Sequence, residues 1–108
     1  MDEISIILLI LLVFLSGCVT SENKPDLEKL KESCISACVN ERNKGTNLSN
    51  GPCLLNPMSE NNDWVCDIAH DPREDVDNLI ENQCSAFRDG RATHFIEVTP
   101  DCKFIRSG

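Results

Sequence analysis

The segment 25–45, PDLEKLKESCISACVNERNKG, carries the clearest structural signal in this chain. Pro25 stands where a helix prefers its first residue, acidic residues follow in the first turn, and Gly45 is typical of a helix end. Apolar residues recur at helical spacing, so that four of them fall on one face. These four are Leu27, Leu30, Cys34 and Cys38. The segment therefore predicts an amphipathic helix with two cysteines on its buried face.

Cysteine is unusually frequent, with seven residues in a chain of 108. All but one lie in the segment expected to fold, and an even set of this kind in an exported chain predicts a disulfide framework. These residues are Cys34, Cys38, Cys53, Cys66, Cys84 and Cys102. Cys34 and Cys38 have parallel Cβ directions on one helix face, so a bridge between them is unfavourable. We expect three purely structural bridges, with Cys34 and Cys38 each paired outside their helix and the remaining connectivity open.

Size and charge limit the classes of function. A chain of 108 residues allows one domain, and a core this small is marginal without cross-links. The chain has 18 acidic and 10 basic residues, a net charge of -8, and no run of Lys and Arg. Nucleic-acid binding needs clustered basic residues for the phosphates, so the composition argues against a nucleic-acid partner. The acidic surface also favours solubility and keeps the domain off an anionic bilayer surface.

An apolar stretch runs from Ile4 to Leu15 and is followed by Ser16, Gly17 and Cys18. A signal peptide needs about 7–15 apolar residues and a membrane-spanning helix about 20, so the length fits a signal peptide. The leader has no Lys or Arg before the apolar stretch, which departs from the usual pattern of signal peptides.

The residues Leu15-Ser16-Gly17-Cys18 resemble the lipobox of prokaryotic membrane lipoproteins. The resemblance implies that the thiol of Cys18 receives a lipid and that a peptidase cuts before Cys18. Residues 1–17 would then be the signal peptide, 18–24 the lipidated N-terminus and short tether, and 25–108 a single cysteine-rich domain. The lipid would hold the protein at the cell membrane, facing outside the cytoplasm. An uncleaved N-terminal anchor and an ordinary secreted protein are the alternatives.

The rest of the chain predicts a small α+β domain. Residues 45–52 predict an exposed loop, in which Asn47-Leu48-Ser49 makes Asn47 a possible glycosylation site. A second helix is predicted to start at Asp71 and Pro72 and to run up to Asp89-Gly90, with the alternative that only its second half is regular. Short strands are predicted at 53–55, 64–68, 92–98 and 102–106. The expected fold is disulfide-stapled, with two helices on one face of a sheet of three or four short antiparallel strands.

Two patterns resemble metal sites, but each has a defect. Cys34, Cys38, Cys66 and His70 are of the residue types that bind zinc, yet such a site would leave the other cysteines without a role. The acidic stretch 63–81 is similar in spacing to a calcium-binding loop. However, Val76 stands where that loop needs Gly, and Asn82 where it needs Glu. We therefore expect no metal and no cofactor, with a weak calcium site in the acidic stretch as the alternative.

No motif of a known reaction class occurs in the sequence. The expected function is that of a lipid-anchored extracytoplasmic cysteine-rich protein, either a binding or a structural component of the envelope, with protein or small-molecule partner unidentified. The alternative is a small exported enzyme or metal-dependent module that uses His70, His94 and the acidic stretch 63–81. Either histidine could act as a base with a nearby carboxylate such as Asp67, Asp71 or Glu97, although His94 is expected at the core edge. A cleft holding both histidines and two carboxylates would favour this alternative.

Overall fold

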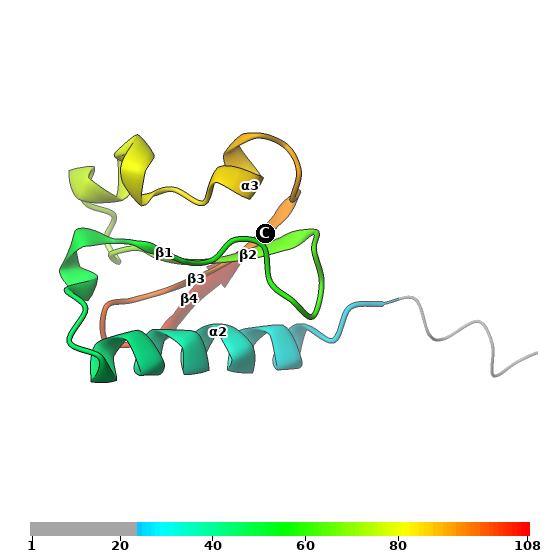
Figure 1. The fold of residues 1–108 in the computed structure, drawn as a ribbon, viewed down its shortest axis with the longest axis horizontal. Coiled ribbons are helices and arrows are strands. Elements are labelled where there is room, and N and C mark those ends of the chain that lie inside the picture. Colours follow the sequence, from blue (N-terminus) through cyan, green and yellow to red (C-terminus); the bar gives the residue numbers. More distant parts are fainter. Residues whose placement is uncertain (1–23) are drawn as a thin grey trace, which may run out of the picture.

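The protein is described here by a computed structural model that covers residues 24–108 (Figure 1). The predictions of a signal peptide, a lipobox and a lipid on Cys18 lie outside the described residues. Within them, the α-helices are α2 (Leu27–Asn43) and α3 (Ser85–Arg88), and the strands are β1 (Cys53–Leu55), β2 (Trp64–Ile68), β3 (His94–Val98) and β4 (Phe104–Ser107). Short 3-10 helices are η2 (Leu48–Asn50), η3 (Asp75–Asn78) and η4 (Ile80–Asn82). A search of residues 24–108 finds no helix with the length and apolar character of a membrane span.

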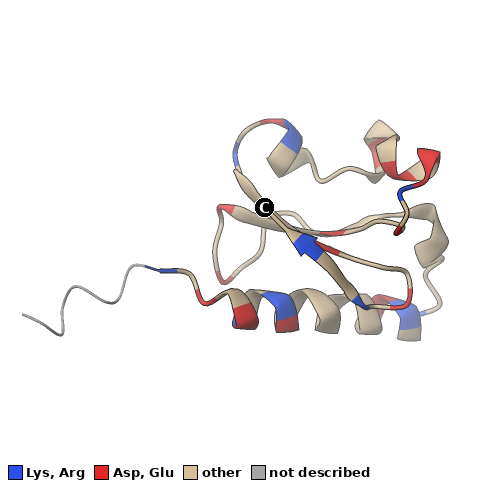
Figure 2. Ribbon diagram, turned by 180° about the vertical axis from the view of Figure 1, so that it is seen from behind, with Lys and Arg blue, Asp and Glu red and all other residues tan. Residues whose placement is uncertain are grey.

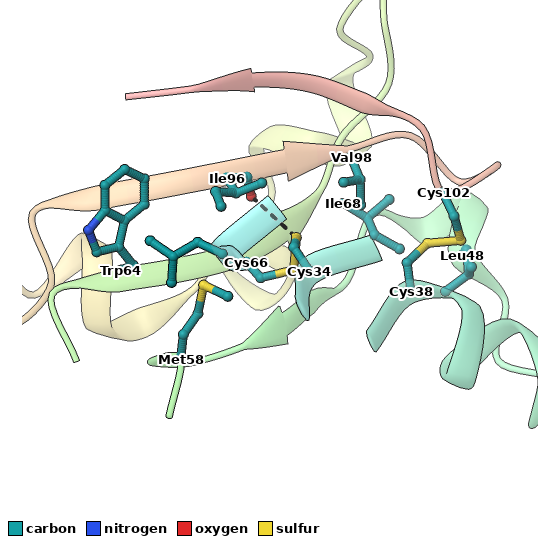
Figure 3. Packing of buried hydrophobic residues seen from close by; sticks show 11 residues of the cluster. Cys34, Cys38, Leu48, Met58, Trp64, Cys66, Ile68, Ile96, Val98 and Cys102 are labelled. Atoms are coloured by element: carbon teal, nitrogen blue, oxygen red, sulfur yellow. Dashed lines mark hydrogen bonds between the residues drawn. A yellow bond between two sulfur atoms is a disulfide. The ribbon is translucent and has the colours of Figure 1, made fainter. Parts of the chain in front are cut away.

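Helix α2 confirms the prediction for its segment and lies along one face of the sheet (Figure 1). The carboxylate of Asp26 caps the helix by accepting a hydrogen bond from the backbone N–H of Lys29. The helix buries Leu30, Cys34 and Cys38, which belong to the predicted stripe. The main core therefore lies between α2 and the sheet (Figure 3). Its buried members include Leu48, Met58, Trp64, Cys66, Ile68, Ile96, Val98 and Cys102.

The strands form one sheet in the order β1-β2-β3-β4. The pairs β1–β2 and β3–β4 are antiparallel, but β2 and β3 run parallel, with Trp64 opposite His94 and Ile68 opposite Val98. The α+β class is confirmed, whereas the prediction that all strands are antiparallel is wrong. A parallel pair needs a crossover connection of a dozen residues or more, and residues 69–93 supply one.

The crossover corrects a second prediction, because the helix expected from Asp71 up to Asp89-Gly90 does not form as one element, and its α-helical part lies in the second half, as the alternative had it. Residues 75–78 and 80–82 form the 3-10 helices η3 and η4, and only Ser85–Arg88 is α-helical. The carboxylate of Asp77 accepts hydrogen bonds from the backbone N–H groups of His70 and Glu74, and such side-chain bonds compete with a regular helix. The crossover lies on the face of the sheet opposite α2, so the helices do not share one face (Figure 1).

All six cysteines of the described residues form disulfides, as predicted. Cys34 pairs with Cys66, Cys38 with Cys102, and Cys53 with Cys84. The first two bridges tie α2 to β2 and to the turn before β4 (Figure 3), and the third ties β1 to the crossover. Cys34 and Cys38 thus each pair outside their own helix. The zinc set is not available, because Cys34, Cys38 and Cys66 are all in disulfides.

Candidate functional site

A cavity of about 590 Å³ opens on the face of the sheet that lies away from α2. The sheet forms its floor, and the crossover with α3 forms its walls. This cavity, which we call the sheet cavity, is lined by Val65, Asp67, Arg73, Gln83, Cys84, Phe87, Arg88, Phe95, Glu97 and Arg106. Its size and its mixture of apolar and charged groups are those of small-molecule sites.

Strand register places a row of charged side chains across the floor of the sheet cavity. Asp67 of β2 lies opposite Glu97 of β3, and Glu97 lies opposite Arg106 of β4. Alternation along β2 and β3 turns Trp64, Cys66, Ile96 and Val98 toward α2, so the residues between them face the cavity. Parallel pairing of β2 with β3 therefore brings two carboxyl groups side by side.

Glu97 is buried and neutralised by two arginines. Oε2 of Glu97 lies 3.0 Å from Nη1 of Arg73, and Oε1 of Glu97 lies 2.9 Å from Nε of Arg106. Arg73 also donates to Oδ1 of Asn78 and to the backbone carbonyl of Asp77. Arg73 thereby links η3, which contains Asp77 and Asn78, to Glu97 on β3, and this link holds one wall of the cavity in place. Close pairing with guanidinium groups offsets the cost of removing a buried carboxylate from water.

Asp67, in contrast, has a buried oxygen that no neighbour satisfies. Its Oδ1 has no hydrogen-bond partner within residues 24–108. Burial, and next the negative charge of Glu97, raise the pKa of Asp67 to about 8. At neutral pH the carboxyl group is therefore mostly protonated, and it can donate a hydrogen bond or a proton to a molecule in the cavity.

The Cys53–Cys84 disulfide adjoins this carboxyl group. The Sγ atoms of both cysteines and a carboxylate oxygen of Asp67 all lie within 4.8 Å of one another. Three such atoms could hold a metal ion if the sulfurs were thiolates, but here they are bonded to each other. Cys84 lines the cavity as well, so the bridge, the carboxyl group and the cavity form one site.

Apolar and basic groups complete the walls. Phe87 of α3 and Phe95 of β3 meet edge to face, with ring centroids 5.5 Å apart, and Val65 lies on the floor. Phe87 is 42% exposed, so its ring is open to a molecule in the cavity. Figure 2 shows basic residues on β4 and at the end of α3, while acidic residues gather on the 3-10 turns of the crossover.

His70 lies at a different place, in a second cavity of about 460 Å³ beyond the carboxyl end of β2. Its Nδ1 is 3.0 Å from Oδ1 of Asp77, and its Nε2 is 3.6 Å from Oε2 of Glu74. Burial alone would raise the pKa of Asp77. Hydrogen bonds from the backbone N–H groups of Glu74 and His70, and from the His70 ring, hold this pKa below its usual value. His70 is therefore oriented by a nearby carboxylate, but this is Asp77 rather than Asp67, Asp71 or Glu97, which were named as examples.

His94 begins β3 at the other end of the sheet. Its ring stacks on Trp64, with centroids 4.7 Å apart, and its Nε2 lies 3.6 Å from Oδ2 of Asp63 rather than near Glu97. Hydrogen bonds from Thr93 hold the pKa of Asp63 below its usual value. Because β2 and β3 are parallel, His94 sits beside the start of β2 and His70 follows its end. The two histidines do not share a cleft, so the two-histidine site is not formed.

The acidic stretch 63–81 is also dispersed. Asp63 bonds Thr93, Asp67 lies in the sheet cavity, and Asp77 bonds His70. Within residues 24–108 these carboxylates do not converge on one point, as a calcium site would require. Asn47 is exposed, and its side chain accepts hydrogen bonds from the backbone and hydroxyl of Ser49 at the start of η2. Exposure of Asn47 does not show whether it carries a glycan, so the glycosylation site stays a prediction.

Sequence reasoning named Asp67 and Glu97 as possible partners of the histidines, and Asp67 also as part of the acidic stretch 63–81. It missed the site that they form with Arg73 and Arg106. Alternation along the second strand had placed Trp64, Cys66 and Ile68 on one face, which leaves Asp67 on the other. That was the available signal. Comparison of the chain with protein-family models, with curated proteins and with solved structures finds no match.

Proposed function

We propose that this protein is a lipid-anchored extracytoplasmic binding domain that takes a small ligand into the sheet cavity. The three disulfides are consistent with an oxidising compartment outside the cytoplasm, and the lipobox-like residues 15–18 supply the anchor. The observation that carries the binding role is the cavity itself. It joins aromatic walls to a floor of fixed charges, one of which is the unsatisfied carboxyl group of Asp67.

The charges of the cavity favour an anionic ligand with an apolar body. Three arginines line the cavity, namely Arg73, Arg88 and Arg106. Its acidic residues are Glu97 and Asp67, and Asp67 is mostly protonated at neutral pH. The cavity is therefore locally positive in a chain whose net charge is -8. A carboxylate or phosphate could bond the guanidinium groups, and an apolar body could pack on Phe87 and Phe95.

A binding experiment on the mature protein in detergent tests this proposal. Phenylacetate serves as the anionic aromatic probe and 2-phenylethanol as its uncharged match, with thermal unfolding and amide chemical shifts as readouts. Phenylacetate should raise the unfolding temperature and shift the amides of α3 and β3, and the alcohol should do so less. Arg88→Gln with Arg106→Gln should abolish the difference, whereas Arg42→Gln on α2 should keep it. Equal responses to both probes would contradict an anion site.

The membrane anchor has its own test. Cys18→Ala should give protein that is either unprocessed or released from the membrane fraction, and intact-mass analysis of the parent should find a lipidated chain that starts at Cys18. A parent chain that keeps Met1 and a free Cys18 thiol would contradict the lipoprotein assignment. Release of the variant without change in far-UV circular dichroism would separate anchoring from folding, because α2 begins only at Leu27.

The second candidate is a small exported enzyme or metal-dependent module. The pairing of His70 with the buried Asp77 favours it, because a carboxylate that fixes one ring nitrogen leaves the other for proton transfer or a metal. This version uses His70 without His94. Isothermal titration with Zn²⁺ tests the metal form: heat that is lost in His70→Gln and retained in His94→Gln would support it, and no difference would contradict it.

A further inference from the structure

We propose that the Cys53–Cys84 bridge is a redox-active disulfide, opened through the sheet cavity by an external thiol, with the carboxyl group of Asp67 as the proton donor. The sequence expectation was that all three bridges are purely structural. This inference concerns covalent chemistry of the chain itself and does not depend on the lipid anchor. It uses the same arginine-lined cavity as the proposed anion site.

Position separates this bridge from the other two. Cys34, Cys66 and Cys38 are 0% exposed and lie in the core between α2 and the sheet, as Figure 3 shows. Cys102 is 8% exposed, but its bridge also belongs to that core. Cys84 is 4% exposed, but among the six bridged cysteines it is the one that lines the sheet cavity, and Cys53 is only partly buried. The cavity therefore gives an external thiol a route to Cys84.

The surroundings of the bridge suit thiol–disulfide exchange. A thiolate is the attacking species, and the arginines that line the cavity, Arg73, Arg88 and Arg106, attract an anion. The walls of Phe87 and Phe95 can pack against the carbon atoms next to the incoming sulfur. A carboxylate oxygen of Asp67 lies within 4.8 Å of both sulfurs, a distance over which one water molecule can relay a proton to the sulfur that leaves.

The exchange proceeds by two successive attacks of external thiolates. The external thiolate bonds to Sγ of Cys84, the bond between Cys84 and Cys53 breaks, and its electron pair passes to Sγ of Cys53, which takes the proton of Asp67. A second external thiolate then attacks the mixed disulfide, releases the oxidised external disulfide and leaves Cys84 as a thiol after protonation from solvent. Two external thiols are oxidised, the bridge is reduced, and solvent returns a proton to Asp67.

The pH dependence follows from all the charged groups that face Asp67. Burial and the carboxylate of Glu97 on β3 raise its pKa, the guanidinium group of Arg73 on the crossover lowers it, and Asp77 of η3 raises it slightly. Arg106 of β4 and Arg88 of α3 line the same cavity. With a pKa of about 8, Asp67 holds its proton at neutral pH and loses it in mildly alkaline solution.

The fold should survive the opening of this bridge. Cys53–Cys84 joins β1 to the crossover, whereas the two other bridges join α2 to β2 and to the turn before β4. The main core and its cross-links therefore remain after reduction. Only the contact of β1 with the crossover should loosen.

Limited reduction followed by alkylation and peptide mapping tests the proposal on the mature protein. Two reductants are compared: reduced glutathione and a protein with a Cys-x-x-Cys dithiol. The reductant that opens the bridge faster shows whether the external thiol is a small molecule or a protein. Cys53 and Cys84 should be alkylated first, with the other four cysteines protected and the far-UV signal unchanged. Labelling of Cys38 and Cys102 at the same rate, or of all six together with unfolding, would overturn the proposal.

Asp67→Asn tests the proton donor, with Glu32→Gln on the exposed side of α2 as matched control. The ratio of the parent's opening rate to the variant's rate cancels the ionisation of the reductant. This ratio should be on the order of 10² at pH 6.5, a usual contribution of general acid catalysis, and should fall toward one above about pH 9. Glu32→Gln should give a ratio of one throughout. A ratio for Asp67→Asn that does not change with pH would overturn the assignment of Asp67.

Discussion

Two neighbouring carboxyl groups on the sheet have different surroundings. Glu97 is paired with Arg73 and Arg106, whereas Oδ1 of Asp67 is buried and has no hydrogen-bond partner within residues 24–108. Burial, and next the negative charge of Glu97, raise the pKa of Asp67, so that Asp67 holds a proton at neutral pH. The site thus places a proton donor beside an arginine-paired carboxyl group, and this arrangement is not visible in the residue types alone.

Asp67 should make the stability of the domain depend on pH. Its pKa is about 8 in the folded protein against 3.8 in the unfolded chain, so the folded state binds more protons between these values. The free energy of unfolding should therefore fall as pH rises from about 4 to about 8. Asp67→Asn should remove this loss and match the parent at pH 4 but exceed its stability at pH 8, by an amount on the order of a few kcal/mol. Thermal unfolding at pH 4, 6 and 8 checks the expectation, and a constant difference between parent and variant would contradict it.

Gly51 is needed because its backbone approaches the carboxylate that holds His70. It has a φ of +68°, and a Cβ at this position would lie 2.7 Å from Oδ1 of Asp77. Gly51→Ala should lower the free energy of unfolding by about 2–3 kcal/mol. Gly45→Ala is the matched control, because Gly45 also has a positive φ but has open space around it. It should cost about 1 kcal/mol, the effect of the backbone alone. Equal losses in urea unfolding would show that the contact with Asp77 contributes nothing.

Among the elements, those with a strong periodic pattern could be predicted and those held by particular contacts could not. Leu30, Cys34 and Cys38 recur at helical spacing, and α2 forms where they predict it. The predicted helix after Asp71 has similar spacing, but Leu79 and Ile80 are exposed, and the side chain of Asp77 bonds backbone groups instead. The pattern of a helix can thus occur without a helix where local side-chain bonds compete.

The candidate site was hidden for a related reason. Its floor depends on the parallel register that sets Asp67 beside Glu97, and this register depends on the path of the crossover rather than on the strands themselves. The three bridges were predictable as a set, since an even number of cysteines and the helical spacing of Cys34 and Cys38 are sequence properties. The sequence could not predict which cysteine lines the cavity, because disulfide connectivity follows from the packing of the whole chain.

Two of the bridges close loops of similar length but differ in burial, so their contributions to stability can be compared. Cys34–Cys66 and Cys53–Cys84 have sequence separations of 32 and 31, so the chain-entropy model gives them nearly equal contributions, about 3–4 kcal/mol each. Cys34 and Cys66 are both 0% exposed, however, and their replacement by Ala leaves a void in the main core. The double variant Cys34→Ala with Cys66→Ala should therefore cost about 1–2 kcal/mol more than Cys53→Ala with Cys84→Ala. Guanidinium unfolding of both variants checks this order, and the reverse order would show that the cavity side carries more of the packing.

At the scale of the whole molecule, a small apolar core is reinforced by three disulfides that join its helices, strands and loops. The main core packs α2 on the sheet, and a smaller cluster of Val65, Cys84, Ala86 and Ala92 lies on the other face. Each cluster contains at least one cysteine of a bridge. Covalent links therefore add to packing on both faces of the sheet, which is how domains of this size usually reach stability.

This arrangement predicts that the fold depends on disulfides rather than on a metal ion. Excess chelator without reductant should leave the far-UV circular dichroism of the mature protein unchanged, because within residues 24–108 the cysteines are bonded in pairs and give no thiolate ligands. Full reduction under denaturing conditions, followed by return to native buffer with the reductant kept, should leave the chain largely unfolded. Three bridges at about 3–4 kcal/mol each are comparable with the whole net stability of a domain, about 5–15 kcal/mol. Removal of the reductant with reoxidation is the control, and it should restore the signal of α2. Loss of that signal in chelator alone would instead reveal a structural metal, and recovery of the signal in the reduced chain would show that packing suffices without the bridges.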